Sequence, residues 1–323
     1  MRLQKPKKDY AIPVLIVVNL VVFVTVIFLW TNQADEMPSV ATDFSTDVLV
    51  HIPLQVSDNA FNDAAVIGLD GVGIDLRSQH ALLINLDSGE IIFDHRGRER
   101  AFPASVTKIM TVLVGIEHSQ SDVVAINANF TALAEAQAAM VGFVFGEERS
   151  IDDVLFGSML ASGADATTSL AYHVSGSYQG FVNLMNETAW RIGMNDTHFM
   201  NASGLHHEEH YTTAYDIALL LEYALTIPRF REIFTTQNYS FINFSGYEQT
   251  LESIMFRNMP SPYFLGGQIL GGMTGFTTPA GLCLASLATN GEEEFALITF
   301  GAPSGGLSYH VLDAFLVYEY FFN

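Results

Sequence analysis

Ser105 and Lys108 are the residues whose types and spacing indicate covalent chemistry. They lie in the segment AFPASVTKIMTVLVGIE, residues 101–117, which reads as a helix that opens at Pro103 or Ala104. A spacing of three places the serine hydroxyl and the lysine amine on one helix face, one turn apart. The N-terminus of a helix, with its free N–H groups and positive dipole end, favours developing negative charge. The pair could therefore act as a nucleophilic serine with a lysine base.

Lysine usage favours this interpretation over a solvated lysine on an ordinary core helix. Lysine occurs only at positions 5, 7, 8 and 108, so the chain beyond residue 8 uses arginine for every other such cation. An exposed lysine could be arginine at little cost. A proton-accepting amine could not, because arginine is effectively never deprotonated. We therefore interpret Lys108 as a base.

The first thirty residues predict a membrane anchor. Residues 1–10 form a basic tail, and residues 11–30 are mostly apolar and long enough, as a helix, to cross roughly 30 Å of hydrocarbon. The basic tail favours a cytoplasmic N-terminus, so we expect a single-pass protein of the cell membrane with an extracytoplasmic folded domain. A cleaved signal peptide is the alternative, but the apolar run is long for one and no clear small-x-small site follows it.

The chain beyond the anchor is strongly acidic. Residues 1–30 carry a net charge of +3, so the overall charge of −21 becomes −24 for residues 31–323. Such a surface disfavours nucleic acid and anionic membranes as binding partners. The single cysteine, Cys283, stands in an apolar run, which predicts a buried thiol with no catalytic role.

Secondary-structure signals divide the rest into a linker, residues 31–65, and one folded domain, residues 66–323. Residues 80–86 and 90–95 are predicted as a hairpin, and two further strands should flank Asn290 and Gly291. Helices are predicted at 134–140, at 150–160 with Ser150 as its cap, as a pair over about 165–193, at 212–225 and at 308–322. Strands at both ends with helices between them predict one α/β domain whose sheet is assembled from the two ends.

Four separated stretches resemble a single family. They are residues 87–117, residues 146–167 with the sequence GEERSIDDVLFGSMLASGADAT, residues 185–221, and residues 271–286 with the sequence GGMTGFTTPAGLCLAS. In order and spacing they resemble the D-alanyl-D-alanine carboxypeptidases, low-molecular-weight penicillin-binding proteins whose signature motifs are Ser-x-x-Lys, Ser-x-Asn and Lys-Thr-Gly. The resemblance covers about residues 75–303. It implies a β-lactamase/transpeptidase-like fold, a mostly antiparallel sheet flanked by helices.

The resemblance implies roles for the first two motifs. Ser105 would be the nucleophile, Lys108 its base and Ser162 a proton relay. The backbone N–H of Ser105 would form one half of an oxyanion hole. The second motif departs from the family pattern, because Ala164 stands where the family has asparagine.

The third motif would bind the substrate. The resemblance implies that Thr274 contacts the substrate carboxylate, that Gly275 and Phe276 line the substrate site, and that the N–H of Phe276 completes the oxyanion hole. Met273 stands where the family has lysine. Loss of that cation, in an acidic domain, predicts that Lys108 stays protonated to a higher pH than in relatives with the full motif, so acylation should rise into the alkaline range.

Two functions of different classes follow. The first is a serine-type D-Ala-D-Ala carboxypeptidase that acts on peptidoglycan stem peptides through an acyl-enzyme on Ser105, with reduced activity and with β-lactams as acylating ligands. The alternative is a catalytically inactive homologue that binds peptidoglycan peptides or a cell-wall partner. The retained Ser105 and Lys108 favour the enzyme, whereas Ala164 and Met273 favour the binding protein. A β-lactamase is a more distant alternative.

No sequence pattern predicts a cofactor or a metal site. The stretch HHEEH at residues 206–210 places His207 and His210 three apart, which does not match the HExxH zinc motif, and reads as a polar loop. Asp165 is expected to cap a helix rather than to titrate in catalysis.

Overall fold

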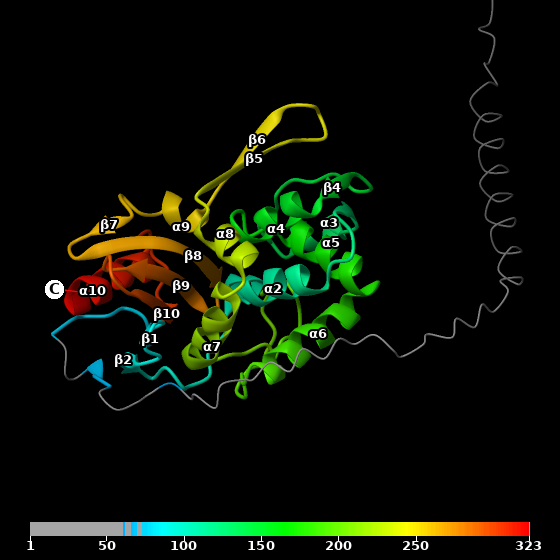
Figure 1. The fold of residues 1–323 in the computed structure, drawn as a ribbon. Coiled ribbons are helices and arrows are strands. Elements are labelled where there is room, and N and C mark those ends of the chain that lie inside the picture. Colours follow the sequence, from blue (N-terminus) through cyan, green and yellow to red (C-terminus); the bar gives the residue numbers. More distant parts are fainter. Residues whose placement is uncertain (1–60, 62–65, 70–72, 323) are drawn as a thin grey trace, which may run out of the picture. The chain divides into compact units, whose positions relative to one another are not determined.

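The sheet is built from both ends of the folded region. The computed structural model describes Phe61 and residues 66–69 and 73–322. Six strands form one sheet in the order β2-β1-β10-β9-β8-β7, and each neighbouring pair is antiparallel (Figure 1). They are β1 His80–Asn85, β2 Ile91–His95, β7 Tyr263–Phe264, β8 Gly267–Thr277, β9 Gly281–Thr289 and β10 Glu294–Ala302. Because β1 pairs with β10, the predicted assembly of one sheet from the two ends is confirmed.

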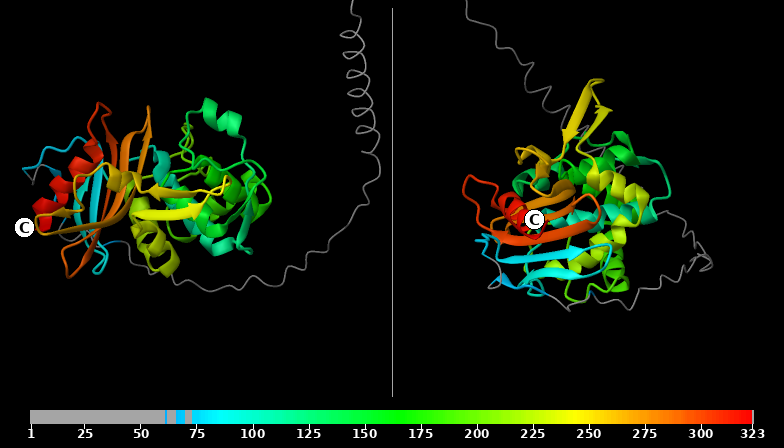
Figure 2. Two further views of the ribbon diagram at one scale, coloured as in Figure 1. Left: turned by 90° about the horizontal axis from the view of Figure 1, so that it is seen from above. Right: turned by 60° about the vertical axis from the view of Figure 1, so that its left-hand side comes forward.

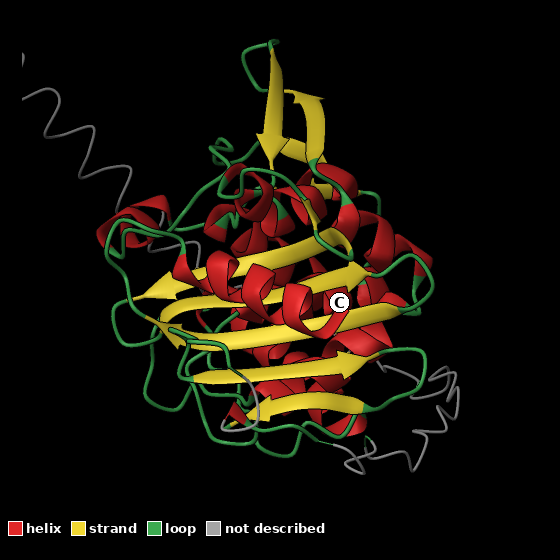
Figure 3. Cartoon of the chain, turned by 90° about the vertical axis from the view of Figure 1, so that its left-hand side faces the viewer, coloured by secondary structure: helices red, strands yellow, loops and turns green. Residues whose placement is uncertain are grey.

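Helices cover both faces of this sheet. One face packs on the 3₁₀ helix η2 (Ala104–Thr107), α7 (Ala214–Leu225) and α8 (Pro228–Thr235), and the other packs on α9 (Ile254–Arg257) and α10 (Tyr309–Phe322). Figure 2 shows the sheet between α10 and the main helical layer, and Figure 3 shows α10 crossing the sheet. The central strands β9 and β10 are buried on both faces, which explains why they read as nearly continuous apolar runs.

Helix α2 (Lys108–His118) is the centre of the helical layer. It packs against α4 (Ile151–Met159), α5 (Ala164–Ser175) and α6 (Tyr178–Arg191). Its residues from 108 to 115 are all buried, as expected for a helix that is apolar on every side. The segment that begins with Ser105 is therefore held between the sheet and a packed helical cluster.

Most of the predicted elements are confirmed. The hairpin of β1 and β2, the two strands flanking Asn290, and helices α5, α6, α7 and α10 lie where the sequence places them. Helix α4 begins after Ser150, whose side chain accepts a hydrogen bond from the backbone N–H of Asp153 at 3.0 Å. The predicted cap is therefore present.

The helix predicted at residues 134–140 is misplaced. Helix α3 spans Phe130–Glu135 and is capped by Asn129, whose side chain accepts from the N–H of Ala132. The alanine-rich residues after it form a loop because the carbonyl oxygen of Ala139 accepts a tertiary hydrogen bond from the N–H of Ala164 at 2.7 Å. This contact with the start of α5 overrides helix propensity.

Two small antiparallel pairs complete the described fold. β3 (Val123–Ala125) pairs with β4 (Glu148–Ser150), and β5 (Asn238–Ile242) pairs with β6 (Glu248–Glu252) in a hairpin that projects from the molecule in Figure 1. The sequence did not predict this hairpin, because each of its strands buries only one residue and so carries little periodicity.

The predicted tail and anchor lie outside the described residues, as does the linker apart from Phe61. Phe61 is buried, and its ring packs edge-on against Tyr215 with a centroid distance of 5.2 Å. Within the part of the chain that the structure describes, no helix is both long enough and apolar enough to span a membrane.

Candidate active site

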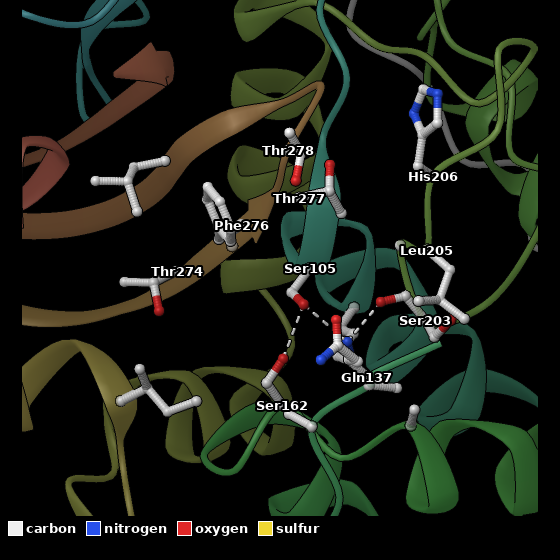
Figure 4. Close-up of a pocket in the computed structure, with 18 of the residues that line it drawn as sticks. Ser105, Gln137, Ser162, Ser203, Leu205, His206, Thr274, Phe276, Thr277 and Thr278 are labelled. Atoms are coloured by element: carbon white, nitrogen blue, oxygen red, sulfur yellow. Dashed lines mark hydrogen bonds between the residues drawn. The ribbon is translucent and has the colours of Figure 1, made fainter. Parts of the chain in front are cut away.

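Ser105, Lys108 and Ser162 meet at one point. Lys108 Nζ lies 3.0 Å from Ser105 Oγ, and the Ser162 hydroxyl, 57 residues further along the chain, donates to the same oxygen at 2.9 Å (Figure 4). Ser105 lies in η2, which leads directly into α2, so the first motif opens as a 3₁₀ turn rather than an α-helix. Ala104 and Ser162 both have positive φ, +46° and +55°. Such conformations are costly for residues with a side chain and are concentrated at functional sites.

Lys108 is buried and has a second partner. Lys108 is only 2% exposed, and its Nζ donates to the carbonyl oxygen of Ser203 at 2.5 Å. Burial lowers the pKa of Lys108 to about 7, and the charge of Asp165 opposes this shift. A substantial fraction of the amine is therefore neutral at neutral pH, as a base must be. The expectation that acylation keeps rising into the alkaline range is wrong, because desolvation of Lys108 outweighs the acidic surroundings. That Lys108 stays protonated to a higher pH than in relatives with the full motif stays a prediction.

The loop that supplies the Ser203 carbonyl is shaped by Asn201. The Asn201 Oδ1 accepts from the backbone N–H groups of Ser203 and Gly204, at 3.2 and 2.7 Å. The same loop accepts a further hydrogen bond one turn along α2, from Thr111 Oγ1 to the Ala202 carbonyl at 2.7 Å. Sequence reasoning missed this contribution, because a carbonyl ligand leaves no side-chain signature.

Asp165 does not cap helix α5 as predicted. The cap position is Gly163, and Asp165 is the second residue of the helix. Its carboxylate accepts from the N–H groups of Val141, Gly142 and Phe143 in the preceding loop, as well as from its neighbour Ala166. Asp165 therefore fixes the loop that runs toward the pocket wall at residues 136–139.

Strand β8 forms the opposite wall of the site. It runs beside η2 and brings Thr274, Gly275 and Phe276 into the pocket that contains Ser105. A Cβ at Gly275 would lie 2.6 Å from the backbone nitrogen of Ser105, so only glycine permits this approach. The ring of Phe276 is half exposed at the pocket mouth.

The two departures from the family motifs occupy different environments. Ala164 lines the pocket, where its methyl group offers no hydrogen bond. Met273 is 2% exposed and belongs to the apolar core between the sheet and the helices. The described pocket wall therefore contains neither the asparagine nor the lysine of the family pattern.

The pocket has a volume of about 580 Å³. Part of its wall is formed by Ile254, Asn258, Leu282, Ser308 and His310, and the rest is formed by four parts of the chain. These are η2 with Lys108, the loop at 136–139 with the start of α5, the loop at 203–206, and β8 with residues 276–279 after the motif. Figure 4 shows Ser105, Ser162 and Ser203 converging between these walls. The space suits a short peptide end rather than a large cofactor.

In the stretch of residues 206–210, His206 and His210 both contact other parts of the protein. His206 lies at the pocket edge, with its ring edge-on to Phe102 at a centroid distance of 4.7 Å. His210 is buried and uses both ring nitrogens in contacts with Thr107 and Met200. Among the residues that the structure describes, no three His, Cys, Asp or Glu side chains are placed to share a metal ion.

Cys283 is buried beneath the site, as predicted. Its residue is fully inaccessible to solvent, and burial raises the pKa of the thiol to about 12. A protonated, inaccessible thiol has no nucleophilic role.

The antiparallel sheet between helices, with serine and lysine meeting beside its strand β8, defines a penicillin-binding, transpeptidase-like fold. Residues 69–304 match the family of D-alanyl-D-alanine carboxypeptidases, and the chain belongs to that family. It is 30% identical over 239 residues to D-alanyl-D-alanine carboxypeptidase DacF of Bacillus subtilis. The matched residues make up 70% of the chain and 58% of that protein. It is 27% identical over 252 residues to D-alanyl-D-alanine carboxypeptidase DacC of Escherichia coli, covering 75% and 60%. The chain thus spans less than two thirds of these relatives.

Solved structures agree on the fold. The Streptomyces K15 DD-transpeptidase superposes with a TM-score of 0.69 at 22% identity, covering 77% of the chain and 98% of that structure. The D-alanyl-D-alanine carboxypeptidase of Mycobacterium tuberculosis H37Rv gives 0.67 at 24% identity, covering 77% and 93%. At this identity the likeness concerns architecture.

Proposed function

We propose that the chain is a serine-type D-Ala-D-Ala carboxypeptidase that acts on peptidoglycan stem peptides through an acyl-enzyme on Ser105. The observation that carries this proposal is the contact between the buried amine of Lys108 and Ser105 Oγ at 3.0 Å, inside a pocket that fits a peptide end. The named activities of the relatives supply the substrate class. A buried amine beside a serine hydroxyl, with no acidic partner in contact, is an arrangement suited to general base catalysis.

Acylation follows from the geometry. Neutral Lys108 accepts the hydroxyl proton of Ser105, and Oγ attacks the carbonyl carbon of the penultimate D-Ala. The carbonyl oxygen becomes negative between the N–H groups of Ser105 and Phe276, which are fixed by backbone and independent of the two motif departures. Protonated Lys108 transfers its proton to Ser162 as Ser162 gives its own hydroxyl proton to the departing amine, so free D-Ala leaves with its new N–H bond and Lys108 becomes neutral again. Lys108 then takes a proton from the attacking water and returns it to Ser105 Oγ as the acyl group leaves as a carboxylic acid.

The Ser203 carbonyl orients the base. A neutral amine has two N–H donors and one lone pair, and the contact of Nζ with this carbonyl occupies one donor at 2.5 Å. Rotation of the amine is thereby restricted, so the lone pair can be presented to the Ser105 hydroxyl.

Substrate recognition is expected to be weaker than in relatives with full motifs. Thr274 lines the pocket and can bind the terminal carboxylate, but no lysine assists it at position 273. A hydrogen bond to a charged partner contributes on the order of 1.5 to 3 kcal/mol, so its loss corresponds to roughly ten- to a hundredfold in binding. β-Lactams, which carry a carboxylate and a strained amide, are proposed as acylating ligands of the same site.

A fluorescent penicillin tests this function. We expect the full chain to become covalently labelled, with the adduct mass on the peptide that contains Ser105, and Ser105→Ala to remain unlabelled. An adduct that persists in Ser105→Ala would refute the nucleophile.

A second candidate function rests on Ala164 and Met273. With both recognition groups absent, a catalytically inactive homologue that binds stem peptides or a cell-wall partner would show the same fold. In that case the chain would bind a D-Ala-D-Ala peptide without releasing D-Ala and without reacting with penicillin.

We also propose that residues 11–30 anchor the chain in the cell membrane, with the folded domain on the extracytoplasmic side. The supporting feature is the apolar run that follows a basic tail. Protease added to intact spheroplasts should digest the domain if this orientation is right, and should leave it intact if the domain is cytoplasmic.

A further inference from the structure

A buried histidine lies behind the nucleophile and has a defined tautomer. His210 is 2% exposed, and its Nδ1 lies 3.0 Å from the backbone nitrogen of Met200. A backbone N–H can only donate, so Nδ1 must be the unprotonated acceptor and the neutral ring carries its proton on Nε2. Burial lowers the pKa of His210 to about 3, so the ring remains neutral at the pH where Lys108 acts as a base.

The proton on Nε2 starts a chain of hydrogen bonds that ends at the nucleophile segment. His210 Nε2 lies 2.7 Å from Thr107 Oγ1, and the Thr107 hydroxyl donates to the carbonyl oxygen of Ala104 at 2.8 Å. Because His210 Nε2 carries the proton, it donates to Thr107 Oγ1, and the Thr107 hydroxyl is left to donate its own proton to the Ala104 carbonyl. A threonine hydroxyl often bonds to the carbonyl three residues earlier, but here its lone pair is held by a residue 103 positions away.

The Ala104 carbonyl belongs to the same peptide unit as the Ser105 N–H. In a planar trans peptide the C=O and the N–H point in opposite directions, so fixing one fixes the other. Two glycines enclose this unit. A Cβ at Gly204 would lie 1.9 Å from the Ala104 oxygen, and a Cβ at Gly275 would lie 2.6 Å from the Ser105 nitrogen. Ala104 also has φ of +46°, a strained conformation that needs support from its surroundings.

We propose that His210 is a positioning residue which, through Thr107, holds the peptide between Ala104 and Ser105 so that the Ser105 N–H is aimed at the developing oxyanion. The inference rests on the proposed function, because that N–H matters for rate only where an oxyanion forms. It assigns to the loop before α7 a part in transition-state stabilisation. His210 itself touches neither substrate nor Ser105 Oγ.

The test uses variants that cut the chain at separate bonds. Thr107→Val removes the hydroxyl with little change in shape. His210→Asn retains an acceptor near the Nδ1 position and loses the donor to Thr107, whereas His210→Gln can present an N–H near the Nε2 position. Ser158→Ala is the matched control, because it removes an equally buried hydroxyl that bonds the carbonyl of an earlier turn, Val154 in α4, and does not line the pocket.

The rate of acylation and the affinity for a transition-state analogue together distinguish a positioning role from a role in packing alone. We expect Thr107→Val and His210→Asn each to slow acylation of Ser105 by fluorescent penicillin about tenfold, since losing a whole oxyanion donor costs roughly 10²- to 10³-fold. The affinity for a boronic acid that forms a tetrahedral anion on Ser105 should fall by the same factor. The double variant should be no slower than either single one, because both act through one chain. His210→Gln should keep most of the rate, and Ser158→Ala should match the starting protein.

Variants that melt at a lower temperature but keep both the rate and the boronate affinity at 25 °C would show a purely structural role and overturn the proposal. So would a double variant whose losses multiply.

A readout independent of catalysis distinguishes failure of this inference from failure of the proposed function. Nitrogen-15 NMR of the full chain should show His210 as the Nε2–H tautomer, and Thr107→Val should shift the Ser105 amide resonance while Ser158→Ala leaves it in place. A chain that never reacts with penicillin would refute the carboxypeptidase function, yet these signals would still test the hydrogen-bond chain. An Nδ1–H tautomer, or a Ser105 amide that does not move, would overturn the inference.

Discussion

The two sides of the pocket differ in how much polar structure they retain. On the nucleophile side, formed by η2, Lys108, Ser162 and the Ser203 carbonyl, the polar side-chain atoms of Ser105, Lys108 and Ser162 each have a partner within 3.0 Å. On the recognition side, formed by Ala164 and β8, a methyl group and a buried thioether occupy the two motif positions that carry polar groups in the family.

The difference follows from burial. A buried amine is costly unless its partners are complete, so the nucleophile side holds either the whole network or none of it. The two departed positions on the recognition side are also buried, but a methyl group and a thioether carry no charge and no strong hydrogen-bonding group, so loss of the family's polar groups lowers affinity without leaving an unsatisfied buried atom. Chemistry and recognition are therefore separable in this chain. Variants on the nucleophile side should change the rate of acylation, and variants on the recognition side should change the binding that precedes it.

The largest expected effect is at the base. Lys108→Arg keeps the positive charge but cannot accept the Ser105 proton, and it forces a larger group into a buried site. We expect acylation by penicillin to fall about 10³-fold or more. Stopped-flow labelling would measure it, with thermal melting to verify folding. A Lys108→Arg protein that acylates within tenfold of the starting rate would refute the role of the lysine as base.

The next effect is at the contact between the two sides. Gly275→Ala places a methyl group 2.6 Å from the Ser105 nitrogen, which must push β8 away from η2 and misalign the oxyanion hole. We expect acylation to fall about a hundredfold. Gly305→Ala is the control, because a Cβ there meets nothing within 4 Å. Equal rates for the two alanine variants would mean that the close approach is unimportant.

A smaller effect is expected from pH. Because the pKa of Lys108 is lowered to about 7, the fraction of neutral amine, and with it acylation, should rise about tenfold per unit below that pH and level off above it. Asp165→Asn removes the charge that raises this pKa, so the rise should move to lower pH. The measurement is the second-order rate of labelling from pH 5.5 to 9.5. A rate that is flat through pH 7, or still climbing at pH 9.5, would contradict the assigned base.

Sequence alone predicted the fold and the meeting of Ser105, Lys108 and Ser162, because these depend on motifs whose order and spacing are informative. It could not predict the Ser203 carbonyl or the Thr107 to His210 contact, which arise from tertiary packing of a loop. The pH expectation failed for a related reason. It counted charges along the chain, whereas burial of Lys108 dominates its pKa.

The same limit applies to the departed motif positions. The sequence treats Ala164 and Met273 as equivalent losses, and only the structure separates them. Both side chains are buried, but Ala164 lines the pocket and packs with Ala128 and Leu133, whereas Met273 packs in the main apolar core.

The smallest expected effect restores the recognition side. In Ala164→Asn an amide enters the pocket wall, where one neutral hydrogen bond contributes about 1 kcal/mol, so acylation should rise about fivefold. Met273→Lys is expected to accelerate the reaction only if its amine reaches the pocket from a buried position, and it should lower the melting temperature because it replaces a core side chain. The measurement is the rate of acylation by penicillin and by a D-Ala-D-Ala peptide in each single variant and in the double variant. If Ala164→Asn gives no gain with either substrate, the recognition side has diverged beyond these positions, and the peptide-binding function becomes the better account.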